Sequence, residues 1–405
     1  MKIKVVVLGK NYSAPLGVLR SLGQASHSID VIYITNHQGD SNIIASSKYV
    51  SRTFEVVGRN DEDILNLLLT EFIDKAIQYI LFPTDDYTSS LIDQNREILQ
   101  EQFLMPYVKD AGSGQITKYM DKAFQTRLAK KHGLNTAQSW IVELDDCPIN
   151  VPKNIVYPCF CKPLISTTGY KSEIKKCRNK NELYNWLELL QKRNKSKTKS
   201  ILVQQFLDIE EEYSISAVCN NQEVIIPCLL KKIWVSQAKR GVTLCGVTES
   251  IENIKFIDNI LALVKSLHYI GMIDIEIFKT GDGIYFNELN FRSSGVIYAV
   301  TKVGVNLPTL LVDILAKGIS KNSCDIDYEK AFFNDRVAWD DYIYGFISKR
   351  KFKELESLSD FSLILTEDDP EPGRLFLEAM REKEQSGKRR VKFIKQIIKK
   401  CLGRL

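Results

Sequence analysis

The chain reads MIDIEIFKTGDGIYFNELNFR from residue 272 to residue 292, and this stretch decides the fold prediction. Apolar residues alternate with acidic ones before the turn residues Gly281-Asp282-Gly283, and a second apolar run follows them, which is typical of two half-buried strands. The stretch therefore predicts a β-hairpin whose strands are Met272–Phe278 and Ile284–Asn290.

A three-residue turn fixes the register of this hairpin. The predicted pairs across the turn are Thr280 with Ile284, Glu276 with Glu288, and Asp274 with Asn290. Because strand side chains alternate between faces, Glu288, Asn290 and Arg292 share one face. We expect that face to gather up to three carboxylates, one amide and one guanidinium.

Carboxylates that face each other on a sheet repel, so the arrangement calls for a cation. Mg²⁺ binds one or two carboxylates and completes its shell with phosphates and water, which makes Glu276, Glu288 and Asn290 candidate ligands. Arg292 is placed to hold a phosphate or acyl phosphate oxygen. The alternative is a solvated hairpin face with ordinary surface charges.

Lysines elsewhere in the chain supply candidate phosphate contacts. Lys162 ends a strand predicted at Tyr157–Leu164, just before a loop at 165–172 that carries Ser166, Thr167, Thr168 and Gly169. Backbone N–H groups in such a loop can approach phosphates, and Lys162 offers a point charge. Lys122, near the start of a predicted helix, is a second candidate. Solvated lysines and a mobile loop are the alternative interpretation.

An apolar strand at Ser200–Leu207 suggests how a nucleotide base is held. Its last residues, Gln204, Gln205, Phe206 and Leu207, can bond adenine through the backbone, and Glu212 can bind ribose hydroxyls. The run Glu210–Glu212 equally fits a solvated charge cluster.

Composition restricts the class of protein. The net charge is +5, but residues 388–405 hold eight Lys or Arg and no acid, so the rest of the chain carries about −3 (+5 minus 8) and predicts no nucleic-acid binding. Nine scattered cysteines without a C-x-x-C pair argue against a zinc site or disulfide framework. With no run of 18 apolar residues, we expect a cytoplasmic protein.

The basic tail is a separate feature. Val391, Ile394, Ile398 and Leu402 fall on one helical face among lysines, so the 388–405 tail could touch an anionic membrane, placing the protein peripherally at the inner face. A helix docked on its own domain, or a solvated tail, also fits.

The order of predicted elements indicates an α/β chain in three parts. Alternating strands and helices over residues 1–112 predict a parallel sheet. Residues 113–320 mix hairpins with helices, and residues 321–405 form a C-terminal extension. Asp85 and Asp86 follow a strand end, where ligands bind in α/β sheets, or else cap the next helix, predicted at Ser89–Gln102.

These motifs together resemble the ATP-grasp superfamily over roughly residues 1–320. The resemblance rests on Met120-Asp121-Lys122, Lys162-Pro163, the Gly169 loop, Val203–Leu207 with Glu212, Ile275–Ile277 and Glu288–Arg292. It implies a pre-ATP-grasp domain at 1–112 and a two-lobed ATP-grasp domain at 113–320. The chain looks most like carboxylate–amine ligases related to D-aspartate ligase and carbamoyl-phosphate-synthase-like proteins.

The resemblance also implies residue roles. Lys122 and Lys162 would contact ATP phosphates, residues 204–207 would hold adenine, and Glu212 would hold ribose. Glu276, Glu288 and Asn290 would bind two Mg²⁺ ions, or Mn²⁺ in their place, and Arg292 would steady the transferred phosphoryl group. Gln205 departs from the acid that many relatives carry, which leaves the adenine contact to backbone groups.

The implied function is amide ligation through an acyl phosphate. A small-molecule carboxylate and amine would be the substrates. Candidate carboxylate anchors are Lys231, Lys232 and Arg240, which lie between a hairpin predicted at Tyr213–Cys219 and Glu223–Leu230 and the helix predicted at Asn253–Leu267. Amino-acid ligation in cell-wall, capsule or small-peptide synthesis fits this chemistry. The alternative is a catalytically silent Mg-ATP-binding module that acts through a partner.

Overall fold

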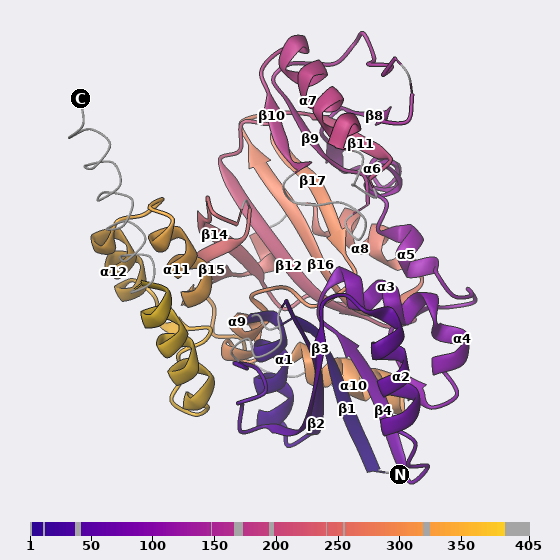
Figure 1. Cartoon of the computed structure of the whole chain (residues 1–405), viewed down its shortest axis with the longest axis vertical. Helices are drawn as coiled ribbons and strands as arrows, with labels where there is room; N and C mark the ends of the chain where they lie inside the picture. Colours follow the sequence, from indigo (N-terminus) through magenta and orange to yellow (C-terminus); the bar gives the residue numbers. More distant parts are fainter. Residues whose placement is uncertain are drawn as a thin grey trace, which may run out of the picture.

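The computed structural model shows a chain of several layers built around two large sheets (Figure 1). It describes residues 2–10, 13–36, 42–146, 148–165, 173–193, 198–239, 241–253, 256–318 and 325–384. The predicted α/β class, with a parallel sheet at the N-terminus, is confirmed. The basic 388–405 tail lies outside the described residues, and among those described no helix is long and apolar enough to cross a bilayer.

The N-terminal sheet has five parallel strands in the order β3-β2-β1-β4-β5. They are β1 (Lys2–Lys10), β2 (Ser28–Thr35), β3 (Val50–Val57), β4 (Ile77–Pro83) and β5 (Phe103–Leu104). Helices α1 (Ser13–Gln24), α2 (Asp61–Glu71), α3 (Asp86–Gln94) and α4 (Arg96–Leu99) connect them. Strands β1, β2 and β4 are apolar and largely buried, as parallel strands covered on both faces require, whereas the edge strand β3 is mostly exposed.

The predicted helix Ser89–Gln102 is wrong in its bounds. Asp85 caps α3 by accepting a hydrogen bond from the backbone N–H of Thr88, so the helix begins at Asp86. It ends after Gln94, and α4 continues as a separate helix. Asp85 therefore has the capping role, while Asp86 stays available for other contacts.

A small antiparallel sheet forms a lobe at the far end of the molecule (Figure 1). Its order is β10-β9-β11-β8, with strands β8 (Ser139–Glu143), β9 (Cys159–Pro163), β10 (Lys175–Cys177) and β11 (Ser200–Gln205). Helix α7 (Lys180–Arg193) packs Leu183, Leu187 and Leu190 into its core. Helices α5 (Gln115–Tyr119) and α6 (Lys122–Lys131) lead into this lobe.

The main sheet has the order β19-β18-β15-β14-β12-β16-β17-β7, with β13 and β6 attached to β12 and β16. Its strands are β6 (Tyr107–Val108), β7 (Asn135–Thr136), β12 (Glu211–Cys219), β13 (Val224–Ile225), β14 (Leu229–Val235), β15 (Thr243–Glu249), β16 (Tyr269–Thr280), β17 (Gly283–Asn290), β18 (Ala331–Phe333) and β19 (Phe361–Ser362). The short η2 (Ile251–Asn253) and the helices α8 (Ile257–Lys265), α9 (Ile297–Lys302) and α10 (Leu307–Lys317) complete this part.

The β16–β17 hairpin confirms the central part of the predicted register. Glu276 pairs with Glu288 and Asp274 with Asn290, as predicted. The turn differs, because Thr280 pairs with Gly283 and the loop is only two residues long. A bulge between Ile277 and Glu276 compensates for that missing residue and restores the register.

The C-terminal part adds strands and helices to the main sheet. Strand β18 pairs with β15, and the helices α11 (Asp335–Ile343) and α12 (Lys349–Ser357) pack on this side (Figure 1). The chain then returns to the N-terminal layer, where the buried Arg20 of α1 forms an ion pair of 3.0 Å with Asp369. Helix α1 is thus joined to the last described segment, residues 325–384.

Candidate active site

The polar face of the main sheet lies opposite the small lobe and gathers the predicted charges. Glu288 of β17 faces Glu276 of β16, and the Nζ atom of Lys122 lies 3.1 Å from Glu288 Oε1. Lys122 begins helix α6, which Asp121 caps through the N–H of Phe124. The cap fixes the start of the helix, and so places a buried lysine against the hairpin.

Asn287 belongs to this centre, although the sequence did not predict it. Its Nδ2 donates to Glu276 Oε2 at 3.2 Å, and its Oδ1 accepts from Lys162 Nζ at 3.4 Å. In a regular strand Asn287 and Glu288 would point to opposite faces, but at a bulge two residues oppose one partner. The bulge therefore brings Asn287 to the same face as Glu288.

Burial and neighbouring charges set the ionisation of the two central groups. Desolvation of the buried Lys162 lowers its pKa to about 8, against the attraction of Glu288. Burial of Glu288 opposes its ionisation, but Lys122 and Lys162 together outweigh that effect and lower its pKa to about 2. Within the described residues no carboxylate pairs directly with Lys162, so an amide is its only hydrogen-bond partner there.

Lys232 connects two of the predicted acids. It lies on β14, with its Nζ 3.3 Å from Glu212 Oε2 and 3.7 Å from Glu276 Oε1. The sequence placed Lys231 and Lys232 between a hairpin and a helix, which is wrong, because residues 229–249 form two further strands. Lys231 pairs instead with Glu211, at 2.6 Å, beside this cluster.

Arg292 bridges the hairpin and helix α3 of the N-terminal part. It lies 3.1 Å from Asp274 Oδ2 and 3.3 Å from Asp86 Oδ1. Asp274 also accepts a hydrogen bond from Ser214 of β12, and burial raises the pKa of its carboxyl group against the opposing effect of Arg292. The carboxylates around Arg292 raise the pKa of its guanidinium against the effect of burial. Asp86 thus joins the site, a residue that the sequence left undecided.

The predicted adenine segment, residues 204–207, lies at the end of strand β11 in the small lobe. The N–H of Gln205 donates to Gln138 O at 2.8 Å, and the N–H of Phe206 donates to Pro158 O at 3.0 Å. Both groups are therefore occupied by the lobe itself. Among the described residues none accepts a hydrogen bond from the N–H of Leu207, which leaves this donor as the candidate for a base.

Five predicted site residues have no described position. Ser166, Thr167, Thr168 and Gly169 of the phosphate loop, and Arg240 of the substrate set, lie outside the described residues. Asn290 is buried on the hairpin opposite Asp274, two residues from Glu288 on the same strand.

The residues present fit a magnesium nucleotide. Two buried lysines beside the hairpin favour an anionic ligand, since burying like charges together is unfavourable without one. Among the described residues no group of three or more His, Cys, Asp or Glu is arranged to hold a metal alone. Glu276 and Glu288, with the Asn290 amide, instead offer the partial shell that Mg²⁺ completes with phosphate and water.

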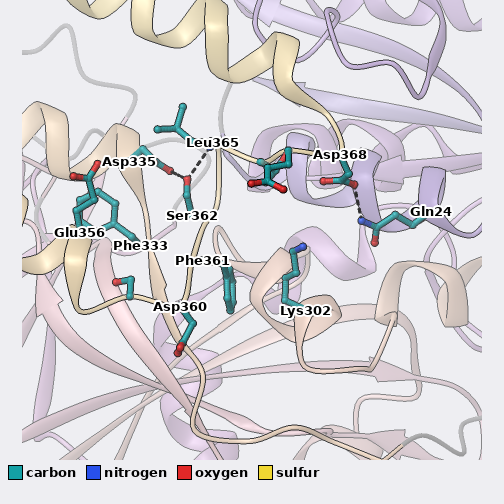
Figure 2. A pocket seen from close by; sticks show the side chains of 13 residues that line it. Gln24, Lys302, Phe333, Asp335, Glu356, Asp360, Phe361, Ser362, Leu365 and Asp368 are labelled. Carbon is teal, nitrogen blue, oxygen red and sulfur yellow. Dashed lines mark hydrogen bonds between the residues drawn. The ribbon is translucent and has the colours of Figure 1, made fainter.

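A separate cavity of about 650 Å³ lies where the C-terminal part meets α1 and α9. Figure 2 shows Lys302 and Phe361 at this cavity and the hydrogen bond between Gln24 and Asp368. No residue of the Lys122–Glu288 cluster lines it. It is therefore distinct from the charged centre on the hairpin.

Comparison with known proteins identifies the class. Residues 127–297 match the family model of the ATP-grasp domain, the family that the motifs predicted. ATP-grasp enzymes use ATP and Mg²⁺, the cofactors that the sequence indicated. The chain is also similar to the C-terminal section of the carbamoyl phosphate synthase large chain from Methanocaldococcus jannaschii, with 24% identity over 217 residues, which are 52% of this chain and 34% of that protein. The chain thus spans about a third of that relative's length.

Solved structures share the fold. N5-carboxyaminoimidazole synthetase from Staphylococcus aureus, complexed with ADP, has a TM-score of 0.63 at 14% identity, covering 87% of each chain. L-amino acid ligase from Bacillus licheniformis has a TM-score of 0.58 at 14% identity, covering 78% of this chain and 75% of that one. At these identities the likeness defines the fold alone.

Proposed function

We propose that this protein is an ATP-dependent carboxylate–amine ligase that forms an amide bond through an acyl phosphate. The observation that carries the proposal is the juxtaposition of the buried Lys122 and Lys162 with Glu276 and Glu288 on one sheet face. Cations for phosphate and oxygen ligands for Mg²⁺ are both needed to transfer a phosphoryl group, and here they lie together.

The first step would transfer the γ-phosphoryl group of ATP. A substrate carboxylate oxygen bonds to phosphorus, the bond to the ADP oxygen breaks, and the products are an acyl phosphate and ADP. Glu276, Glu288 and Asn290 would hold Mg²⁺, which neutralises phosphate charge. Lys122 and Lys162 would position the phosphates, and Arg292 would lie on the acceptor side because it reaches Asp86 at the start of helix α3.

The second step would consume the acyl phosphate. An amine attacks the acyl carbon, phosphate leaves with the bonding electrons, and the amine loses a proton to give the amide. The name of the L-amino acid ligase neighbour favours amino acids as the first substrates to examine. Lys232, held between Glu212 and Glu276, is a candidate anchor for the substrate carboxylate.

An assay of ADP release tests the proposal. Purified protein with Mg-ATP would be screened against L- and D-amino acids, each paired with amine acceptors, and products would be identified by mass spectrometry. We expect ADP release that depends on both substrates, and a product whose mass equals their sum minus water. ADP release that no carboxylate stimulates would contradict the proposal.

A second candidate is a silent Mg-ATP-binding module. The 24% identity to the relatives leaves room for lost chemistry, but the charged centre is complete in the described residues that form it. Tight Mg-ATP binding without turnover across the whole panel would favour this second function.

A further inference from the structure

A loop between β14 and β15 joins the C-terminal part to the charged centre. Asp341 of helix α11 accepts hydrogen bonds from Ser236 Oγ at 2.5 Å, from the N–H of Gln237 at 3.0 Å and from the N–H of Ala238 at 2.9 Å. The Asp341 side chain is fully buried. A buried carboxylate needs such donors, and all three come from consecutive loop residues.

The other end of this loop touches the site. Lys232 Nζ donates to the carbonyl oxygen of Gly241 at 3.2 Å, and the same ammonium group contacts Glu212 and Glu276. The base of the loop is closed by the N–H of Ser236, which donates to Val242 O at 2.9 Å. A displacement of the loop would therefore move an acceptor of Lys232.

The hydrogen bonds of Asp341 are specific to the loop between β14 and β15. Its neighbour Asp340 pairs with Lys239 of the same loop at 3.1 Å, so helix α11 meets the loop at two successive residues. Asp335, also buried on α11, serves another segment, because it accepts from Ser362 Oγ and from the N–H of Ile364. One helix thus carries two buried aspartates with separate targets, which provides a matched pair for experiment.

We propose that Asp341 is a positioning residue that fixes the described loop residues 236–239 and, through Gly241, the ammonium group of Lys232. The C-terminal part then completes the wall of the active site from outside the matched ATP-grasp region at 127–297. The role in substrate binding rests on the proposed ligase function. The tethering of the loop by Asp341 does not depend on that function, and it can be tested without any substrate.

Limited proteolysis of the full chain tests the tether, since the loop carries a trypsin site at Lys239. Cleavage after Lys239 would be timed by mass spectrometry in the wild type, Asp341→Asn and the control Asp335→Asn. We expect Asp341→Asn to accelerate cleavage about tenfold, because local opening controls access. Asn places an N–H donor where the carboxylate accepted, so at least one loop bond is lost. The control should change the rate by less than about twofold.

Ser236→Ala provides a milder second variant, in case the aspartate change prevents folding. It removes the hydroxyl that donates to Asp341 and accepts from the N–H of Lys239, and leaves the helix intact. Faster loop cleavage in this variant also supports the proposal. Cleavage at the wild-type rate in both folded variants would overturn it.

Kinetics then tests the substrate role. With a substrate pair that supports ADP release, Asp341→Asn should raise the KM of the carboxylate or amine about tenfold and leave the KM of ATP within about twofold. A merely structural residue would lower the active fraction and reduce kcat alone. A lower kcat with unchanged KM values would overturn the positioning role. A wild-type protein that releases no ADP would instead refute the proposed ligase function, and the proteolysis experiment would still test the tether.

Discussion

At the scale of residues, Asn287 links the two halves of the charged centre. It bonds both Lys162, proposed to hold phosphate, and Glu276, proposed to hold Mg²⁺. We expect Asn287→Leu to lower the rate of ADP formation about tenfold and to raise the Mg²⁺ concentration needed for half the maximal rate, since both side chains lose their orientation. Steady-state kinetics at varied Mg²⁺ measures both effects.

The matched control for this variant is Asn221→Leu, an exposed amide beyond the end of β12. It should leave both quantities unchanged. An Asn287→Leu enzyme with wild-type rate and Mg²⁺ requirement would show that the bulge does not serve the site.

The lowered pKa of Lys162 predicts that nucleotide binding depends on pH. Its folded-state pKa of about 8 lies below the ordinary lysine value of 10.5, so the free protein loses this charge as the pH rises through 8. Phosphate favours the charged form, and binding above pH 8 must take up a proton. We expect ADP affinity, measured by calorimetry, to fall from pH 7 to pH 9, by at most about tenfold per unit above pH 8.

The variant Lys162→Arg distinguishes deprotonation of Lys162 from deprotonation of other groups as the cause of the pH dependence. Arginine stays charged throughout this range, so the variant should bind ADP with a flatter pH profile, even if its affinity at pH 7 is lower. Identical profiles for Lys162→Arg and the wild type would assign the pH dependence to another group.

At the scale of elements, the sequence predicted the hairpin but not its details. Alternation and glycines located both strands, and the pairing of Glu276 with Glu288 followed from counting residues. Counting residues gave the right pairs because the turn is one residue shorter than predicted and the bulge at Asn287 adds one residue back. Neither feature can be recognised from the alternation of apolar and polar residues along one strand. Strands β14 and β15 were missed, because the sequence analysis placed Lys231 and Lys232 in a connection as candidate carboxylate anchors, although they pair across the sheet with Glu211 and Glu212.

The start of helix α3 provides a prediction at this scale. Asp85 accepts from the N–H of Thr88 and caps the helix that carries Asp86 toward Arg292. We expect Asp85→Ala to lower the free energy of unfolding by about 1 kcal/mol, since one N–H loses its acceptor, and Asp85→Ser to retain most of it. Urea unfolding measures both, and equal stabilities for the wild type and Asp85→Ala would contradict the capping role.

At the scale of the whole molecule, the fold brings together segments that no local pattern connects. The site draws Asp86 from helix α3, Lys122 from α6, Lys162 from the small lobe and Glu288 from the main sheet. The motifs located most of these residues. Asp86 and Asp341 could not be assigned from the sequence, because their partners, Arg292 and Ser236, are far away along the chain.

The buried ion pair between Arg20 and Asp369 connects helix α1 to the C-terminal part of the chain, and we expect it to contribute to stability. Arg20 also donates to the carbonyl oxygens of Leu363 and Ile364, both near Asp369. We expect Asp369→Ala to lower the free energy of unfolding by about 3–5 kcal/mol, because a fully buried guanidinium loses its counter-charge. Thermal and urea unfolding would show this, while Arg374→Ala, which breaks exposed ion pairs only, should leave the Tm unchanged.

The central claim is that Glu288 and its neighbours use Mg-ATP to activate a carboxylate. Its most direct test is substrate-dependent ADP formation by the wild type and by Glu288→Gln, which keeps the side-chain size but removes a proposed metal ligand. We predict that the folded variant, checked by circular dichroism, loses ADP formation by at least about a thousandfold. A folded Glu288→Gln protein that forms ADP at the wild-type rate would contradict the account.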